Sequence, residues 1–217
     1  MNVLRIAILL LIADLIVSTA TMATARTIEL SDLDCDRMAV IVPQAPRASW
    51  AMYELGAGEF STMLLDMKVE RSFLIRYPLD RIPVGQRITR AEWIVPVSLV
   101  APAGEHRLHV RRLVGEWGTG VSHLYRMQRP KVVPWGAPGA ASTKTDRAAQ
   151  ASAIVKIDGP GEQTVNVTED VELWYTGAAA NQGWIITVED PTSLIRLNSP
   201  LWTGQGTYKL RITYEPE

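Results

Sequence analysis

The side chains best suited to chemistry gather between Glu105 and Lys131. This stretch holds six Lys or Arg against two Glu, and the chain's three histidines, His106, His109 and His123, all lie within it. A guanidinium group binds a carboxylate or sulfate through two parallel hydrogen bonds, a geometry that Lys does not match. The region is therefore predicted to bind an acidic ligand.

Period-two alternation determines which of these side chains share a face. In "RLHVRR" it places Leu108 and Val110 on one side of a strand and Arg107, His109 and Arg111 on the other. Aromatic rings nearby supply faces on which sugars can stack. The predicted ligand-binding residues are Arg107, His109, Arg111, Arg112, Tyr125 and Trp135.

Trp135 has two interpretations. Pro134 and Gly136 flank it and Pro138 follows, so a rigid loop presents the ring either as an exposed stacking face or as a lid over a sandwich. The basic face also has an alternative, a solvated surface paired with the acidic stretch 158–190, which has seven Asp or Glu and no Lys or Arg.

Catalytic and metal sites are weaker candidates. His109, His123 and Tyr125 beside Arg111 and Arg126 resemble the parts of a polysaccharide lyase, but no base and partner can be positioned, so no catalytic residue is predicted. No cofactor or metal site is predicted either. Calcium is the alternative, with oxygen ligands from Asp158, Glu162, Glu169, Asp170 and Glu172, although their spacing matches no calcium loop.

Short alternating segments between turns must position these residues. "RSFLIRYPLD", "RLHVRRLVGEW", "GWIITVED" and "YKLRITYEP" are examples. They predict an all-β fold, an antiparallel jelly-roll-like β-sandwich with one short helix over "EDVELWYTG" that ends at Gly177. Trp93, Trp174 and Trp184 are expected in its core.

The amino-terminal stretch predicts export. Arg5, an apolar run over 6–17 and the small residues Ala23-Thr24-Ala25 form the three regions of a secretory signal, so residues 1–25 are predicted to be a signal peptide; an uncleaved anchor is the alternative. Residues 26–58 are expected to form an extension with one possible edge strand, and 59–217 the sandwich. The predicted location is secreted, periplasmic or cell-surface, without membrane insertion after cleavage.

Charge and cysteine usage narrow the partners. A net charge of −1 gives no electrostatic basis for binding nucleic acid or a membrane surface. Cys35 is the only cysteine, so the chain has no internal disulfide. Its carboxylate neighbours oppose thiolate formation, and an inert or partly buried thiol is expected.

Four stretches resemble the DNRLRE-type domains: "RSFLIRYPLDRIPVGQRITRAEWIVPV", "HVRRLVGEWGTGVSHLYRM…VPWGAPGA", "VNVTEDVELWYTGAAANQGWIITVED" and "SPLWTGQGTYKLRITYEP". The resemblance covers Phe60 to Tyr214. It departs from the family at Ser122-His123, usually Thr-Trp, at Asn166, usually Asp, and at 207–209, which replace an Arg-Pro approach to the last strand.

The resemblance implies a jelly-roll sandwich of secreted bacterial or archaeal proteins. Related modules bind polysaccharides, including acidic ones such as alginate. The combined expectation is an exported, non-catalytic module that binds an extracellular, acidic polysaccharide or another cell-surface polymer. The alternatives are a structural or adhesive matrix protein, with Cys35 in contacts between chains, and a polysaccharide lyase. The oligomeric state is not predicted.

Overall fold

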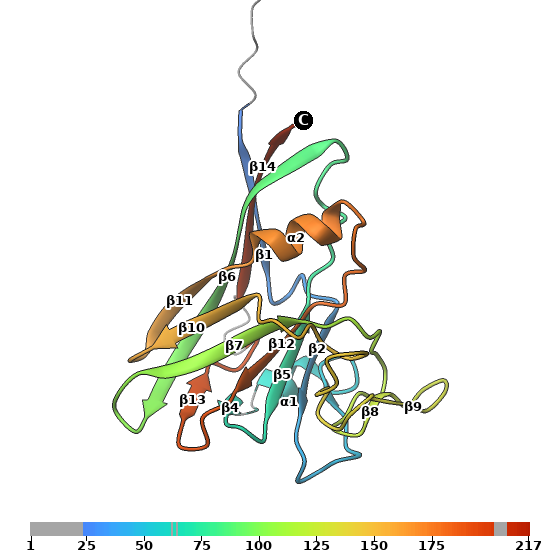
Figure 1. Cartoon of the computed structure of the whole chain (residues 1–217), viewed down its shortest axis with the longest axis vertical. Coiled ribbons are helices and arrows are strands. Elements are labelled where there is room, and N and C mark those ends of the chain that lie inside the picture. The colour runs from blue at the N-terminus through green and yellow to red at the C-terminus, as the bar shows by residue number, and fades with distance from the viewer. Residues whose placement is uncertain (1–23, 62, 64, 202–207) are drawn as a thin grey trace, which may run out of the picture.

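Two antiparallel sheets of six strands each pack face to face (Figure 1). The structure is a computed structural model that describes residues 24–61, 63, 65–201 and 208–217; almost all of the predicted signal peptide lies outside these ranges. The prediction of an all-β sandwich is confirmed. The first sheet consists of β1 (Arg26–Ser31), β4 (Leu65–Met67), β6 (Gln86–Ala101), β11 (Gly161–Asn166), β13 (Leu194–Leu197) and β14 (Lys209–Pro216).

The second sheet and the remaining elements complete the chain. The second sheet consists of β2 (Arg37–Ile41), β3 (Trp50–Ala51), β5 (Ser72–Arg76), β7 (His106–Arg112), β10 (Ala153–Ile157) and β12 (Trp184–Val188). A separate ribbon pairs β8 (Tyr125–Met127) with β9 (Val133–Pro134), and the helices are α1 (Ala57–Ser61) and α2 (Thr168–Tyr175). Helix α2 matches the predicted helix, whereas α1 was not predicted.

The strand order is that of a jelly roll. The order β4-β13-β6-β11 in one sheet faces β5-β12-β7-β10 in the other, and the chain repeatedly crosses between the sheets. Strand β6 is long because two strands share one of its sides. β14 pairs with its first half, over 86–94, and β13 with its end, over 97–101.

Residues 26–58 belong to this sandwich. They contribute β1 at the edge of the first sheet and β2 and β3 at the edge of the second, where one possible edge strand was expected. Leu30 and Met38 are fully buried in the core that the rest of the chain builds. The segment is thus integral to the fold.

Stacked aromatic rings fill the space between the sheets. The ring of Trp93 lies 6.3 Å from that of Trp184 and 6.1 Å from that of Tyr208, and Trp174 on α2 packs 4.7 Å from Trp184. All three tryptophans predicted to be core residues are buried, which confirms that prediction. Together these rings anchor α2 against the sandwich.

A second, smaller hydrophobic cluster lies outside the sandwich, on the outer face of the second sheet. The strands give it Ala39, Ile41, Ala51, Leu74 and Ile185. The segment 113–148, here called the covering loop, folds over them with Leu113, Trp117, Val121, Trp135 and Ala140. The covering loop includes the β8–β9 ribbon, which projects beside the sandwich in Figure 1.

Buried hydrogen bonds hold the covering loop in place. The Nε1 groups of Trp117 and Trp135 donate to the carbonyl oxygens of Gln182 (2.8 Å) and Ser122 (2.9 Å). The buried carboxylate of Asp146 accepts three backbone N–H groups within the loop, at 2.8–3.1 Å. Because every one of these groups has a partner, the loop is a fixed layer of the structure.

Candidate anion-binding site

The outer face of β7 carries the side chains that alternation predicted. Leu108 and Val110 point into the core, so Arg107, His109 and Arg111 point outward. Arg107 lies at the exposed start of the strand and bonds to Glu105 at 3.3 Å. Arg111 is different, because its side chain is only 12% exposed. The two arginines on this face therefore have distinct surroundings.

Arg112 points to the opposite side of the strand from Arg111. Its Nε lies 2.9 Å from Oδ1 of Asp170, a carboxylate that also accepts a 2.6 Å hydrogen bond from Nε1 of Trp184. Burial raises the pKa of Asp170, opposed by its hydrogen bonds and by Arg112. The structure thus gives Arg112, a predicted ligand-binding residue, a structural role away from the outer face.

The two predicted aromatic ligands lie in the covering loop. Trp135 is 5% exposed and its ring is part of the outer cluster, so the stacking-face interpretation is wrong and the lid interpretation is correct. The ring is buried because the strands beneath it are apolar on this face as well as on the inner one. Tyr125, half-buried on β8, does not line the cleft described below.

Three nitrogen-bearing side chains instead converge near Glu189, just after β12. Nη2 of Arg111 donates to Oε1 of Glu189 at 2.6 Å, and Nδ1 of His109 lies 3.6 Å from the same oxygen. Nη1 of Arg111 also lies 3.3 Å from Oγ1 of Thr187. Arg147 reaches the cluster from the covering loop, where it bridges to Leu113.

Donors in this cluster exceed acceptors. Nε of Arg147 and Nδ1 of His109 are buried without a hydrogen-bond partner. Burial lowers the pKa of Arg147, and the neighbouring charge of Arg111 lowers it further. Asp146 and Glu189 act in the opposite direction, but the backbone N–H groups already occupy the Asp146 carboxylate. An anion placed here would satisfy donors that the protein leaves unfilled.

A cleft of about 330 Å³ adjoins the cluster. It is lined by Val69, Glu70, Ser72, His123, Pro138, Gly139, Ala141, Arg147, Thr187, Val188 and Glu189. Gly139 adopts φ of +75°, and a Cβ there would lie 3.0 Å from the His123 ring. Glycine therefore allows His123 to lie close against the turn, at the wall of the cleft.

Part of this site was predictable from the amino-acid sequence. His109 and Arg111 were predicted ligand-binding residues, and His123 departs from the family that the sequence resembles. Arg147 was not predicted, because it lies in a loop without periodicity. Ser72 and Thr187 were not predicted either; they are polar positions in strands that are otherwise apolar. Those isolated hydroxyl residues in apolar strands are the signal that the sequence offered.

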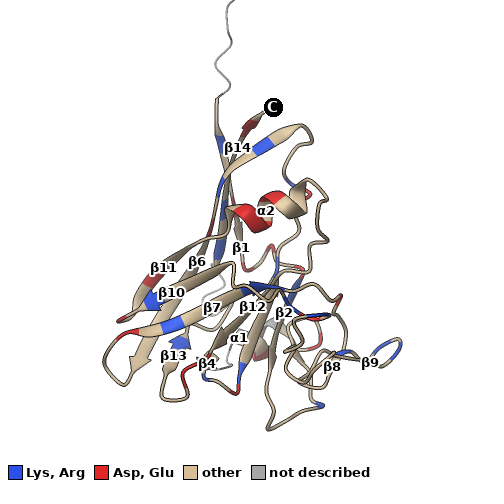
Figure 2. Ribbon diagram, in the orientation of Figure 1, with Lys and Arg blue, Asp and Glu red and all other residues tan. Residues whose placement is uncertain are grey.

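Figure 2 shows acidic residues on α2 and basic ones along β7. Among the residues that the structure describes, no three His, Cys, Asp or Glu side chains gather to hold a metal ion. No helix in the described ranges is long and apolar enough to cross a membrane.

Cys35 is buried as expected, its Sγ donates to the Asp32 carbonyl at 2.9 Å, and burial raises its pKa.

The chain matches no model of a known protein family, and a search of curated proteins finds no relative. The resemblance to DNRLRE-type domains therefore stays a prediction that rests on the four quoted stretches.

Proposed function

We propose that the protein is an exported, non-catalytic module that binds an acidic polysaccharide in the cleft beside Arg111 and Arg147. The observation that carries the proposal is the convergence of these two guanidinium groups near one carboxylate, Glu189, with Nε of Arg147 left without a partner. A carboxylate or sulfate group on a sugar is a natural partner for such donors.

The other walls of the cleft suit a sugar ring. The hydroxyl-bearing side chains of Ser72 and Thr187 offer donors and acceptors, and Pro138 and Val188 offer apolar contact. A volume of about 330 Å³ falls at the lower end of the range for small-molecule sites. These dimensions and groups favour one charged sugar unit of a longer chain over a large compact ligand.

Export is supported by the predicted signal peptide at 1–25, since β1 starts at Arg26, directly after the proposed cleavage position. The family resemblance adds that related modules are secreted and bind polysaccharides. The proposed location is secreted, periplasmic or cell-surface.

The test compares variants of the purified protein in affinity electrophoresis against alginate, pectate, sulfated glycans and a neutral glucan. Arg111→Met and Arg147→Met should each weaken retention by acidic polymers about tenfold or more, as expected for a lost charge-assisted contact. Arg107→Met, on the same face outside the cleft, is the matched control. If Arg111→Met and Arg147→Met both stay folded and are retained like the original protein, the site assignment is wrong.

A lyase is the second candidate, because His123 and Arg147 line the same cleft. Burial lowers the pKa of His123, which favours the neutral form that a general base needs, and a guanidinium could neutralise the substrate carboxylate. Incubation with acidic polymers should then produce absorbance from new unsaturated ends, and His123→Gln should abolish it. Binding without such absorbance supports the module.

A matrix protein is the remaining alternative. The buried thiol of Cys35 is not available for contacts between chains in this structure. Light scattering with and without reductant distinguishes a matrix protein from a binding module, since a monomer that binds glycans excludes assembly as the function.

A further inference from the structure

A second hollow surface lies at the edge of the second sheet, around Trp50. Strand β3 pairs with β2 so that Trp50 lies opposite Val40 and Ala51 opposite Ala39. Ala39 and Ala51 face the outer cluster, so Trp50 faces the other way, where it lines a hollow together with Asp66 of β4 in the first sheet. Trp50 remains 37% exposed, which is unusual for a residue with so large a ring held in a strand.

Two adjoining hollows of about 400 and 300 Å³ share the side chains of Val42, Trp50 and Arg71 and are together called the Trp50 groove. The other residues that line the groove are Val40, Gln44, Ala45, Met63, Asp66, Lys68 and Glu70. The groove thus combines an exposed indole face and aliphatic contacts with a polar rim.

The rim favours an anionic occupant. The carboxylate of Asp66 is bound by Arg196, at 2.5 and 3.1 Å, and Glu70 accepts a hydrogen bond from Gln44. Arg196 lowers the pKa of Asp66, and the positive charges of Arg71 and Lys68 lower it further. Arg196 therefore neutralises Asp66, which leaves the two positive charges of Lys68 and Arg71 against the one negative charge of Glu70 at the rim.

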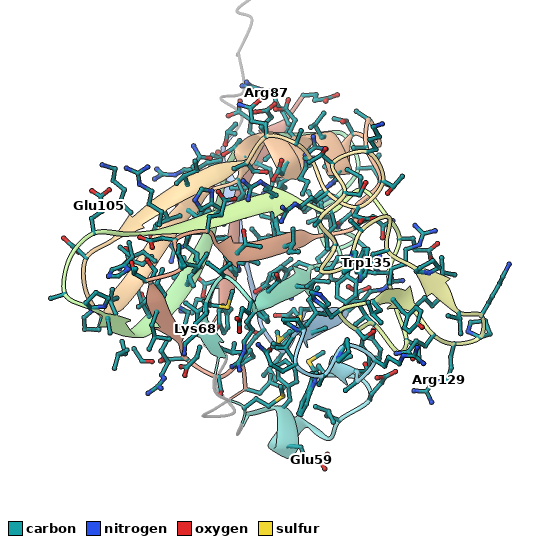
Figure 3. All side chains as sticks on the ribbon, turned by 60° about the horizontal axis from the view of Figure 1, so that its bottom comes forward. Glu59, Lys68, Arg87, Glu105, Arg129 and Trp135 are labelled. Atoms are coloured by element: carbon teal, nitrogen blue, oxygen red, sulfur yellow. The ribbon has the colours of Figure 1, made fainter. Side chains whose placement is uncertain are left out.

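The loop between β4 and β5, residues 68–71, borders both this groove and the cleft beside Arg147. Val69 and Glu70 line the cleft, and Lys68, Glu70 and Arg71 line the groove. In Figure 3, where the bottom of Figure 1 comes forward, Lys68 lies near the middle of this end of the molecule, with Trp135 to one side. A linear polymer that occupies the cleft can cross this short loop and enter the groove.

We propose that the Trp50 groove is a second subsite for the same acidic polysaccharide, in which the indole stacks on the apolar face of a sugar ring. Lys68 and Arg71 contact the acidic groups of neighbouring units. The inference rests on the proposed function, because it assigns the groove to the chain held at Arg111 and Arg147. The inference adds an aromatic contact to the binding site. This contact was predicted at Trp135 and is now assigned to Trp50.

The experiment measures affinity by calorimetry for oligosaccharides of increasing length, prepared from whichever of alginate, pectate or a sulfated glycan the protein retains. Trp50→Ala should weaken binding of octasaccharides about tenfold, the scale of one aromatic contact, and leave disaccharide binding unchanged. Arg147→Met should weaken both. Tyr53→Ala, which removes an exposed ring outside the groove, should change neither.

The outcomes separate the two proposals. If Arg147→Met weakens binding and Trp50→Ala leaves octasaccharide binding unchanged, the groove is not a subsite while the proposed function stands. If neither variant changes binding, the proposed function fails as well. A second readout covers misfolding: octasaccharides should perturb the fluorescence of the original protein more than that of Trp50→Phe, and equal responses would overturn the inference.

Discussion

The guanidinium of Arg112 lies 2.9 Å from the carboxylate of Asp170 and thereby joins β7 to α2 across 58 residues of sequence. Asp170 is almost completely buried, its side chain 5% exposed, and it also accepts the indole N–H of Trp184. One carboxylate thus connects the helix to two strands of the second sheet.

Loss of this connection should unfold the protein more easily. Arg112→Met leaves the Asp170 carboxylate buried without its cation, which is expected to cost about 3 kcal/mol in the free energy of unfolding. Urea denaturation measures it. The control is Arg107→Met, whose exposed pair with Glu105 should contribute less than about 1 kcal/mol. Equal free energies of unfolding for the two variants would show that the Arg112–Asp170 pair contributes no more to stability than the exposed Arg107–Glu105 pair.

Replacement of Trp135 should destabilise the protein more than replacement of Trp50. Trp135→Ala leaves a cavity in the outer cluster and removes a buried hydrogen bond, with an expected loss of about 3–5 kcal/mol. Trp50→Ala should lower stability by only about 1 kcal/mol, because its ring is partly exposed. Thermal unfolding of both variants under one condition provides the comparison. A smaller loss at Trp135 than at Trp50 would contradict the assigned positions.

Acid should destabilise the protein through His109 and His123. Burial lowers the pKa of both below the ordinary value of 6.5, so the folded protein resists the proton that the unfolded chain accepts. Their contribution to stability is complete above about pH 6.5 and is lost as the pH falls through the lowered pKa values. The melting temperature should therefore fall between pH 7 and pH 5. Replacing both histidines by Gln should flatten that fall, and an unchanged slope would exclude them.

Binding of an anionic ligand should favour protonation of His109. Arg107, Arg111 and Arg147 oppose a proton on His109 and Glu189 favours one, so a bound anion shifts the balance toward protonation. Binding of an acidic oligosaccharide near pH 6 should take up protons, which calorimetry in buffers of different ionisation enthalpy detects. In His109→Gln the uptake should decrease. No uptake in the original protein would place the anion away from His109.

Cys35 should be unreactive while the protein is folded. Burial raises its pKa, and the nearby carboxylates of Asp32, Asp36 and Asp34 raise it further. Labelling by a thiol reagent at pH 8 should therefore require unfolding and follow the same urea dependence as unfolding itself. Rapid labelling of the native protein would instead make the thiol accessible and strengthen the matrix alternative.

The alternation of residue types along a strand predicted the face on which each side chain lies. Alternation in "RLHVRR" correctly placed Arg107, His109 and Arg111 on one face, because side chains of a strand alternate whatever surrounds them. It could not reveal that Arg112 meets Asp170, a contact that arises from the crossing of distant strands. Arg147 was missed for the same reason, since its position depends on how the covering loop folds.

Trp135 shows a signal that was present and not used. The segments "MAVI" and "WII" are continuously apolar rather than alternating, which indicates strands buried on both faces. A sheet of that kind needs a cover, and the adjacent loop with its two tryptophans supplies it. The flanking Pro and Gly described the rigidity of the loop but not the direction in which its ring points.

The pairing of β1 with β14 places both ends of the described chain on the same side of the sandwich. The strands run antiparallel with Arg26 opposite Tyr214, so both ends of the sandwich chain leave at one pole. The loop at 68–71 lies toward the other pole; in Figure 3 Arg87 lies at the top of the view, Glu59 at the bottom and Lys68 between them. A tether at either terminus would therefore point the cleft and the Trp50 groove outward, away from the surface of attachment.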